Sequence, residues 1–240
     1  MQSQREFDLA SQELQLLRKA FGCHFKDPLG VSNHFLDCLD NWSSKWKPTV
    51  YYAPYTSLVQ GSGTGKSRLF KEISRNVYIF YCCFRSLGST GYPQRSSIAS
   101  VLLDTPSDRY GTILQFVAYL NSSLLQLAEE LSQEFPCTKS EWYKQQIKES
   151  EVEGFRGSFW APIKQKMDHF VKSFDMPQKE ENFCAQLQNA LKSTVFTVRS
   201  MLSNQTRALE VIFAFDEARA LLEPHDTLNG NNLFYYLIMA

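Results

Sequence analysis

The run "VYIFYCCF", residues 77–84, joins eight apolar or aromatic residues with no polar residue at alternate positions. A strand with one face in water alternates apolar and polar residues, so this run is typical of a strand that is covered on both faces. Strands of that kind belong to parallel sheets, whose long connections are usually helices. The run therefore predicts an α/β fold.

A glycine-rich stretch, "QGSGTGKS" at residues 60–67, precedes this strand and follows a short apolar segment, residues 55–59. Apolar residues at helical spacing then predict a helix over residues 65–75. The order of strand, glycine loop, helix and strand is a βαβ unit, whose crossover is right-handed. A further apolar segment, residues 211–215, predicts a third strand.

Helical patterns fill most of the remaining chain. The apolar spacing predicts helices over residues 5–22, 31–46, 110–134, 140–175 and 180–203, with breaks near residues 154–157 and at Pro177. We interpret residues 1–47 as an N-terminal helical extension. The α/β part then covers residues 48–240, with a long helical insertion over about residues 100–205 between its second and third strands.

The glycine-rich stretch is close to a phosphate-binding loop, in which a glycine and four further residues precede Gly-Lys-Ser or Gly-Lys-Thr. Its last three residues are Gly65, Lys66 and Ser67, whereas Gln60 replaces the opening glycine. Such a loop turns backbone N–H groups toward phosphate oxygens at a helix N-terminus. Lys66 would reach the β- and γ-phosphates, and the Ser67 hydroxyl would coordinate Mg²⁺. Gly61 can supply the backbone freedom that Gln60 lacks. The alternative is a flexible turn that happens to contain a lysine.

An acidic pair follows the third predicted strand in "VIFAFDEAR", where Asp216 precedes Glu217. Hydrolysis at a phosphate-binding loop requires an acidic residue that holds Mg²⁺ through water and a group that orients the attacking water. Asp216 and Glu217 are candidates for these two roles. The alternative is a solvated acidic turn that caps the next helix. Lys66 and Asp216 are far apart in sequence. We expect the fold to bring the two halves of the site together, provided that the third strand pairs beside residues 55–59.

Three blocks, "SLVQGSGTGKSRLFKEI", "IFYCCFRSLGSTGYPQ" and "FAFDEARALL", resemble the P-loop ATPase module of many uncharacterised fungal proteins, which is related to the Crinkler-type effectors of fungi and oomycetes. The resemblance covers about residues 45–222. It implies a three-layer α/β sandwich around a parallel sheet, with residues 48–240 as a partial P-loop NTPase domain of the additional-strand type. ATP and Mg²⁺ are the ligands that it implies.

The resemblance also implies roles for individual residues. Nucleotide binding would fall to the loop and the first turn of the helix, which comprise Ser62, Gly63, Thr64, Gly65, Lys66, Ser67 and Arg68. Ser67 and Asp216 would hold Mg²⁺, and Glu217 would be the catalytic glutamate. Arg85 ends the second strand, at the edge where open α/β sheets bind their ligands. It would either contact phosphate or pair with an acidic neighbour.

The chain departs from this module after Glu217. An additional-strand core needs further parallel strands that carry a polar sensor residue and, usually, an arginine finger, whereas this sequence closes on "LFYYLIMA", residues 233–240. That run is at most a stub of the next strand. We therefore expect a truncated or incomplete module, in which nucleotide binding persists and efficient hydrolysis does not. No nuclease constellation is visible in the sequence.

Two other functions are consistent with the sequence. One is a non-catalytic interaction protein, for which nucleotide is a structural ligand or is lost. The other is a helicase, because "DEAR", residues 216–219, is similar to a helicase acidic box, although a Ser-Ala-Thr-like motif and a second recombinase-like domain are missing. The lack of an Asn-Lys-x-Asp motif disfavours a GTPase. The helical insertion and the N-terminal helix are candidate surfaces for a protein partner.

Composition and charge narrow the choice further. Lys and Arg together number 25, as do Asp and Glu, so no global field favours nucleic acid or an anionic membrane. No apolar run approaches the length of a membrane span, and the polar N-terminus lacks the apolar core of a secretory signal. The six cysteines lack metal-ligand spacing, and we interpret them as reduced thiols of an intracellular, cytoplasmic protein.

Overall fold

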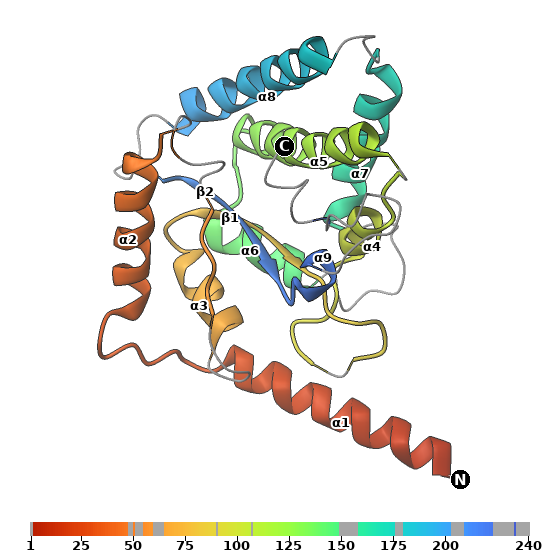
Figure 1. Ribbon diagram of the computed structural model, residues 1–240. Helices are drawn as coiled ribbons and strands as arrows, with labels where there is room; N and C mark the ends of the chain where they lie inside the picture. The colour runs from red at the N-terminus through yellow and green to blue at the C-terminus, as the bar shows by residue number, and fades with distance from the viewer. Residues whose placement is uncertain are drawn as a thin grey trace.

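The structure is a computed structural model of residues 1–240, and it describes residues 2–47, 50, 55–59, 65–89, 91–106, 108–148, 158–175, 180–202, 209–222 and 233. Within these ranges, helices surround one small parallel sheet (Figure 1). The elements in chain order are α1 (Gln2–Gly22), α2 (Val31–Lys45), α3 (Lys66–Ile73), β1 (Tyr78–Cys83), α4 (Ser97–Leu103), α5 (Arg109–Leu131), α6 (Lys139–Lys148), α7 (Trp160–Ser173), α8 (Glu180–Leu202), β2 (Val211–Asp216) and α9 (Arg219–Leu222).

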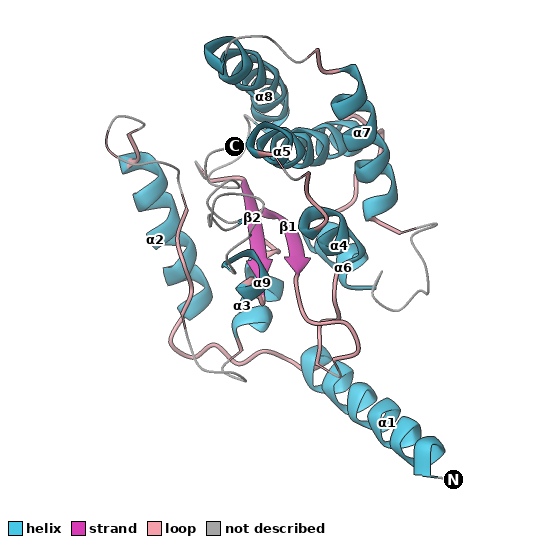
Figure 2. Ribbon diagram, turned by 45° about the vertical axis from the view of Figure 1, so that its right-hand side comes forward, coloured by secondary structure: helices cyan, strands magenta, loops and turns pink. Residues whose placement is uncertain are grey.

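β1 and β2 form a parallel pair, in which Tyr78 lies opposite Val211 and Cys83 lies opposite Asp216. Every residue of β1 is buried, as the unbroken apolar run predicts, whereas most of β2 is half-buried. Both strands run in the same direction (Figure 2), so their carboxyl ends meet at one edge of the sheet. The strands expected over residues 77–84 and 211–215 are therefore confirmed.

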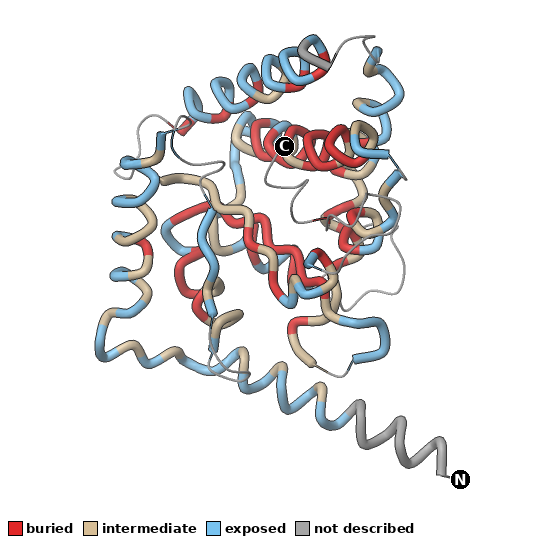
Figure 3. The backbone as a smooth tube through the Cα atoms, viewed as in Figure 1, coloured by how far each residue is buried: buried red, intermediate tan, exposed pale blue. Residues whose placement is uncertain are grey.

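Alternate residues of β1 pack into two different hydrophobic cores. Phe80 and Cys82 belong to a core that they share with residues of α4, α5, α7 and α8, whereas Ile79 and Tyr81 face a second core with residues of α3 and α6. The two-residue period of a strand places neighbouring side chains on opposite faces. Figure 3 shows β1 buried between these helical layers. This arrangement is compatible with the expected three-layer sandwich, which stays a prediction because two strands do not define its strand order.

Helix α6 covers the edge of β1 that faces away from β2. Gln146, which is 3% exposed, donates from Nε2 to the carbonyl oxygen of Ile79 at 2.7 Å and accepts at Oε1 from the Tyr81 N–H at 2.7 Å. Buried backbone groups at a strand edge are costly when they lack partners. One glutamine side chain thus satisfies two ladder groups that a further strand would otherwise pair, and the sheet ends at β1 on this side.

The described residues of the predicted helical insertion are mostly helical, in α4 to α8, with non-helical connections between these helices. Helix α5 packs against α7 and α8, and a buried hydrogen bond of 2.6 Å joins Thr194 Oγ1 on α8 to Asn121 Oδ1 on α5. The helices expected over residues 110–134 and 180–203 are confirmed, as are the two N-terminal helices. Among the described residues, no helix combines the length and the apolar character that crossing a membrane requires.

One expected strand is not formed. Residues 55–59 have no regular secondary structure, and Tyr55 and Val59 are 56% and 85% exposed. Among the described residues the sheet contains only β1 and β2, so the expectation that the third strand pairs with a strand at residues 55–59 is wrong. A strand needs a neighbour that completes its ladder of hydrogen bonds, and the described residues give this segment none. Except for Leu233, the expected strand stub at residues 233–240 lies outside the described part of the chain.

Candidate functional site

The glycine loop enters α3 at Gly65. This residue has φ 91° and ψ 17°, a left-handed conformation that a side chain disfavours, and its carbonyl oxygen accepts from the Leu69 N–H at 2.8 Å. The first N–H groups of a helix lack partners within the helix and are available to an anion. The predicted loop residues Gln60, Ser62, Gly63 and Thr64 lie outside the described residues, so Gly65, Lys66 and Ser67 represent the motif here.

Ser67 and Asp216 meet directly. The Ser67 hydroxyl, in the first turn of α3, donates to Oδ2 of Asp216, the last residue of β2, at 2.6 Å. The Tyr81 hydroxyl donates to the same carboxylate oxygen, and the Glu217 N–H donates to Oδ1 at 2.9 Å. Asp216 is 9% exposed. Both oxygens of a nearly buried carboxylate are therefore held in one orientation.

Two buried tyrosines, Tyr81 and Tyr143, donate hydrogen bonds to the two residues of this contact, Asp216 and Ser67. The rings of Tyr81 and Tyr143 lie 5.5 Å apart, centroid to centroid, and the Tyr143 hydroxyl donates to the Ser67 carbonyl oxygen at 3.4 Å. Burial raises the pKa of both hydroxyl groups well above 10, and the negative charge of Asp216 acts in the same direction. Both tyrosines consequently stay protonated at neutral pH and serve as donors.

The sequence did not identify Tyr81 as a site residue. It belongs to the apolar run, where an aromatic residue is indistinguishable from core. Its role follows from the strand register, because it precedes Cys83, the partner of Asp216, by two positions and therefore lies on the same face of β1. That register involves a strand from the far end of the chain, which local sequence patterns do not encode.

Arg85 and Glu217 form an ion pair at the same edge of the sheet. Arg85 Nη2 lies 3.3 Å from Glu217 Oε1, and Arg85 Nε donates to the Pro93 carbonyl oxygen at 3.1 Å. Of the two roles expected for Arg85, the structure has the pairing with an acidic neighbour. Glu217 also has φ 53°, a strained value for a residue with a side chain, and such strain tends to occur at functional sites. A side chain at Gly91 would collide with the Arg85 guanidinium.

Arg68, in contrast, points away from Ser67 and Asp216. Its Nε lies 3.0 Å from Glu72 Oε1, and its guanidinium donates to the Cys23 carbonyl oxygen, in the segment after α1. The site that the sequence predicted as one group therefore divides in two. Ser67 lies with Asp216 at the carboxyl edge of the sheet, whereas Arg68 faces the N-terminal segment.

The oxygen atoms of Ser67 and Asp216 fit a hard divalent cation such as Mg²⁺. Because the Ser67 hydroxyl donates its hydrogen bond to Asp216, the lone pairs of its oxygen remain for a cation. The described residues contain no group of three or more His, Cys, Asp or Glu side chains that could hold a metal. A cation here would take its other ligands from water and phosphate, which is usual for Mg²⁺ at phosphate sites.

The family model described as Domain of unknown function (DUF8735) matches residues 27–240. The chain belongs to the DUF8735 family. The match contains all the residues of the site described above, from Gly65 to Glu217. Helix α1 and the segment to Lys26 precede it. Comparison with curated proteins gave no match, and comparison with solved structures gave none.

In this DUF8735 domain, the three sequence blocks singled out above converge in space. The loop block contributes Ser67, the second block contributes Tyr81 and Arg85, and the acidic block contributes Asp216 and Glu217. All six cysteines are free, and Cys82 and Cys83 are buried in β1. The convergence of polar groups thus comes from residues that no local pattern joins.

Proposed function

We propose that the chain binds Mg²⁺ together with a nucleoside triphosphate, with ATP as the ligand that the sequence resemblance favours. One observation carries this proposal: the 2.6 Å hydrogen bond that joins Ser67, after the Gly-Lys of the loop, to Asp216, at the end of a parallel strand. A flexible turn that merely contained a lysine would give no reason for this contact with a nearly buried aspartate.

Each residue then has a definite task. Backbone N–H groups at the start of α3 bind phosphate oxygens, and Lys66 contributes its positive charge to the same phosphates. Ser67 offers a hydroxyl lone pair to Mg²⁺, while Asp216 accepts the hydrogen bond from this hydroxyl and orients water around the cation. Mg²⁺, when bound, neutralises charge on the phosphates. Tyr81 holds Asp216 in position from inside the core.

In hydrolysis, Glu217 would act as the general base that takes a proton from the attacking water. A specific observation favours the second candidate, nucleotide binding without turnover. Because Arg85 Nη2 lies 3.3 Å from Glu217 Oε1, this ion pair occupies a carboxylate oxygen that a general base would need for the attacking water. Binding and turnover are therefore separate parts of the proposal, and an intracellular, cytoplasmic location with free thiols suits both. A protein partner at the helical insertion remains part of this proposal.

The binding proposal is tested by thermal unfolding with Mg²⁺ and ATP. At about 100 times the dissociation constant, a ligand adds about 2.7 kcal/mol, which raises the Tm of a chain of this size by roughly 5–10 °C. Lys66→Ala should abolish the shift. Lys164→Ala is a matched control, because Lys164 lies on α7 in an ion pair with Asp168. A wild-type protein without a shift at millimolar ATP would exclude nucleotide binding.

A further inference from the structure

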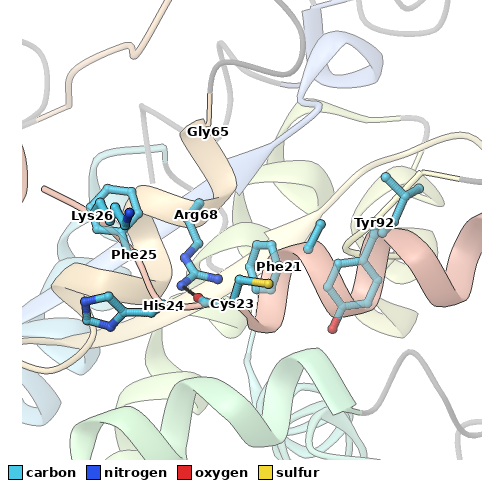
Figure 4. Close-up of a pocket in the computed structure, with 10 residues that line it drawn as sticks. Phe21, Cys23, His24, Phe25, Lys26, Gly65, Arg68 and Tyr92 are labelled. Carbon is cyan, nitrogen blue, oxygen red and sulfur yellow. Dashed lines mark hydrogen bonds between the residues drawn. The ribbon is translucent and has the colours of Figure 1, made fainter.

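A cavity of about 510 Å³ lies beside the start of α3. Residues from three parts of the chain line it (Figure 4): Phe21 and Phe25 at and after the end of α1, Gly65 and Arg68 of the α3 start, and Tyr92 in the loop after β1. Its volume is within the range of small-molecule sites, about 300–1,000 Å³. Gly65 belongs both to this lining and to the N-terminal end of α3, so the cavity adjoins the end of the helix that is proposed to bind phosphate.

The wall formed by the N-terminal segment is fixed to α3 by two cationic side chains. Lys71 Nζ donates to the Phe21 carbonyl oxygen at 2.8 Å, and the Arg68 guanidinium donates to the Cys23 carbonyl oxygen. The Arg68 guanidinium carbon also lies 5.6 Å from the ring centroid of Phe21 and 5.7 Å from that of Phe25. Such cation–π contacts stabilise the rings next to the charge.

Arg68 itself is held by an acidic partner. Glu72, whose side chain is 4% exposed, lies 3.0 Å from Arg68 and 2.9 Å from Arg75. The aromatic wall is therefore attached to the same helix whose first turn carries Lys66 and Ser67. A ligand that enters the cavity from Gly65 meets rings whose positions are set by α3.

The chemistry of the lining suits a planar aromatic ligand. Phe21 and Tyr92 are in edge-to-face contact, with centroids 5.0 Å apart, and Phe25 lies on the other side of Arg68 (Figure 4). Aromatic side chains bind nucleobases by stacking, because every base has a π face. A ligand made of phosphate alone would leave this apolar space empty.

We propose that this cavity receives the base and ribose of the nucleoside triphosphate whose phosphates bind at the start of α3. The inference rests on the proposed function and adds the subsite that distinguishes a nucleotide from inorganic polyphosphate. It also gives residues 17–26, which precede the DUF8735 match, a direct part in ligand binding. The N-terminal helix is then attached to a wall of the nucleotide site.

Calorimetric titration with Mg²⁺-ATP and with Mg²⁺-tripolyphosphate tests the proposal. Wild-type protein should bind ATP at least about tenfold more tightly than tripolyphosphate. Phe25→Ala should weaken ATP binding about tenfold, which is typical of a lost stacking contact, and should leave tripolyphosphate binding within about twofold. Phe135→Ala is the matched control, because Phe135 is 84% exposed and lies outside the cavity lining.

Equal affinity for the two ligands in wild-type protein, or unchanged ATP affinity in Phe25→Ala, would overturn the base subsite while leaving phosphate binding intact. Failure of both ligands to bind would instead remove the proposed function and, with it, the subsite. Phe25→Leu covers the case in which Phe25→Ala does not fold, since it keeps apolar bulk and removes the ring. It should lose ATP affinity and keep tripolyphosphate affinity.

Discussion

The Ser67 hydroxyl donates a 2.6 Å hydrogen bond to Asp216 Oδ2 across a separation of 149 residues. The contact joins the first turn of α3 to the last residue of β2. It forms although the segment before the loop is not a strand, because β1 fixes both partners: α3 packs on one face of β1, and β2 pairs along its edge. The strand between the loop helix and the insertion thus organises the site.

Replacing Tyr81 by Phe should destabilise the protein and should make its ATP affinity depend less on the Mg²⁺ concentration. The substitution removes a donor to the Asp216 carboxylate, and hydrogen bonds to charged groups contribute about 1.5–3 kcal/mol. Urea unfolding measures the loss of free energy, and ATP titration at several Mg²⁺ concentrations measures the effect on the site. Tyr78→Phe is the control on the same strand, because Tyr78 faces the other core. Equal effects of the two substitutions would exclude a specific role for Tyr81.

Arg85→Gln should raise any ATP turnover that depends on Glu217. The substitution removes the ion pair that occupies Glu217 Oε1, so this oxygen becomes available to accept a hydrogen bond from the attacking water. Stability should change by less than about 1 kcal/mol, because the pair is partly exposed. Phosphate release measures turnover, and Glu217→Gln should abolish it both alone and together with Arg85→Gln. A fall in turnover with Arg85→Gln would mean that Arg85 acts on phosphate.

Gln146→Ala should cost more than about 2 kcal/mol of folding free energy. It leaves the Ile79 carbonyl and the Tyr81 N–H buried without their partner, and each unsatisfied group costs about 1–3 kcal/mol. Urea unfolding measures the difference. Gln145→Ala is a close control, since Gln145 is the exposed neighbour on the same helix. A small loss for Gln146→Ala, similar to that for Gln145→Ala, would contradict the edge-capping role.

Stability should fall as the pH rises above about 10. Burial raises the pKa of Tyr81, Tyr119 and Tyr143 well above their usual value of 10.0. Above pH 10 the unfolded chain therefore loses these phenolic protons while the folded chain keeps them, so the free energy of unfolding decreases with pH. Below pH 10 these three tyrosines do not make the free energy of unfolding depend on pH. The exposed tyrosines among the eleven, such as Tyr55, should ionise first, and the tyrosinate absorbance of the buried ones should appear only as the circular dichroism signal is lost. Ionisation of all tyrosines before the circular dichroism signal changes would contradict the prediction.

The sequence alone predicted the elements whose signals are local. The unalternating run of β1 indicated a strand buried on both faces, and the loop, α3 and the acidic end of β2 were all recognisable from a few consecutive residues. The segment at residues 55–59 has a shorter and weaker apolar signal, interrupted by Thr56 and Ser57, and is not a strand. An apolar run shows that a segment can pair, whereas pairing itself requires a neighbour at the correct distance.

Residue types therefore determined where helix α3 and the two strands form and which polar side chains stand at their ends. The tertiary structure alone decided that β2 pairs with β1, that Tyr81 donates to Asp216 and that Gln146 closes the sheet edge. It also turned Arg68 away from Ser67 and toward the N-terminal segment. The physical reason is the range of the interactions: helix and strand signals arise within a few residues, whereas strand register and buried hydrogen bonds join residues that only the folded chain brings together.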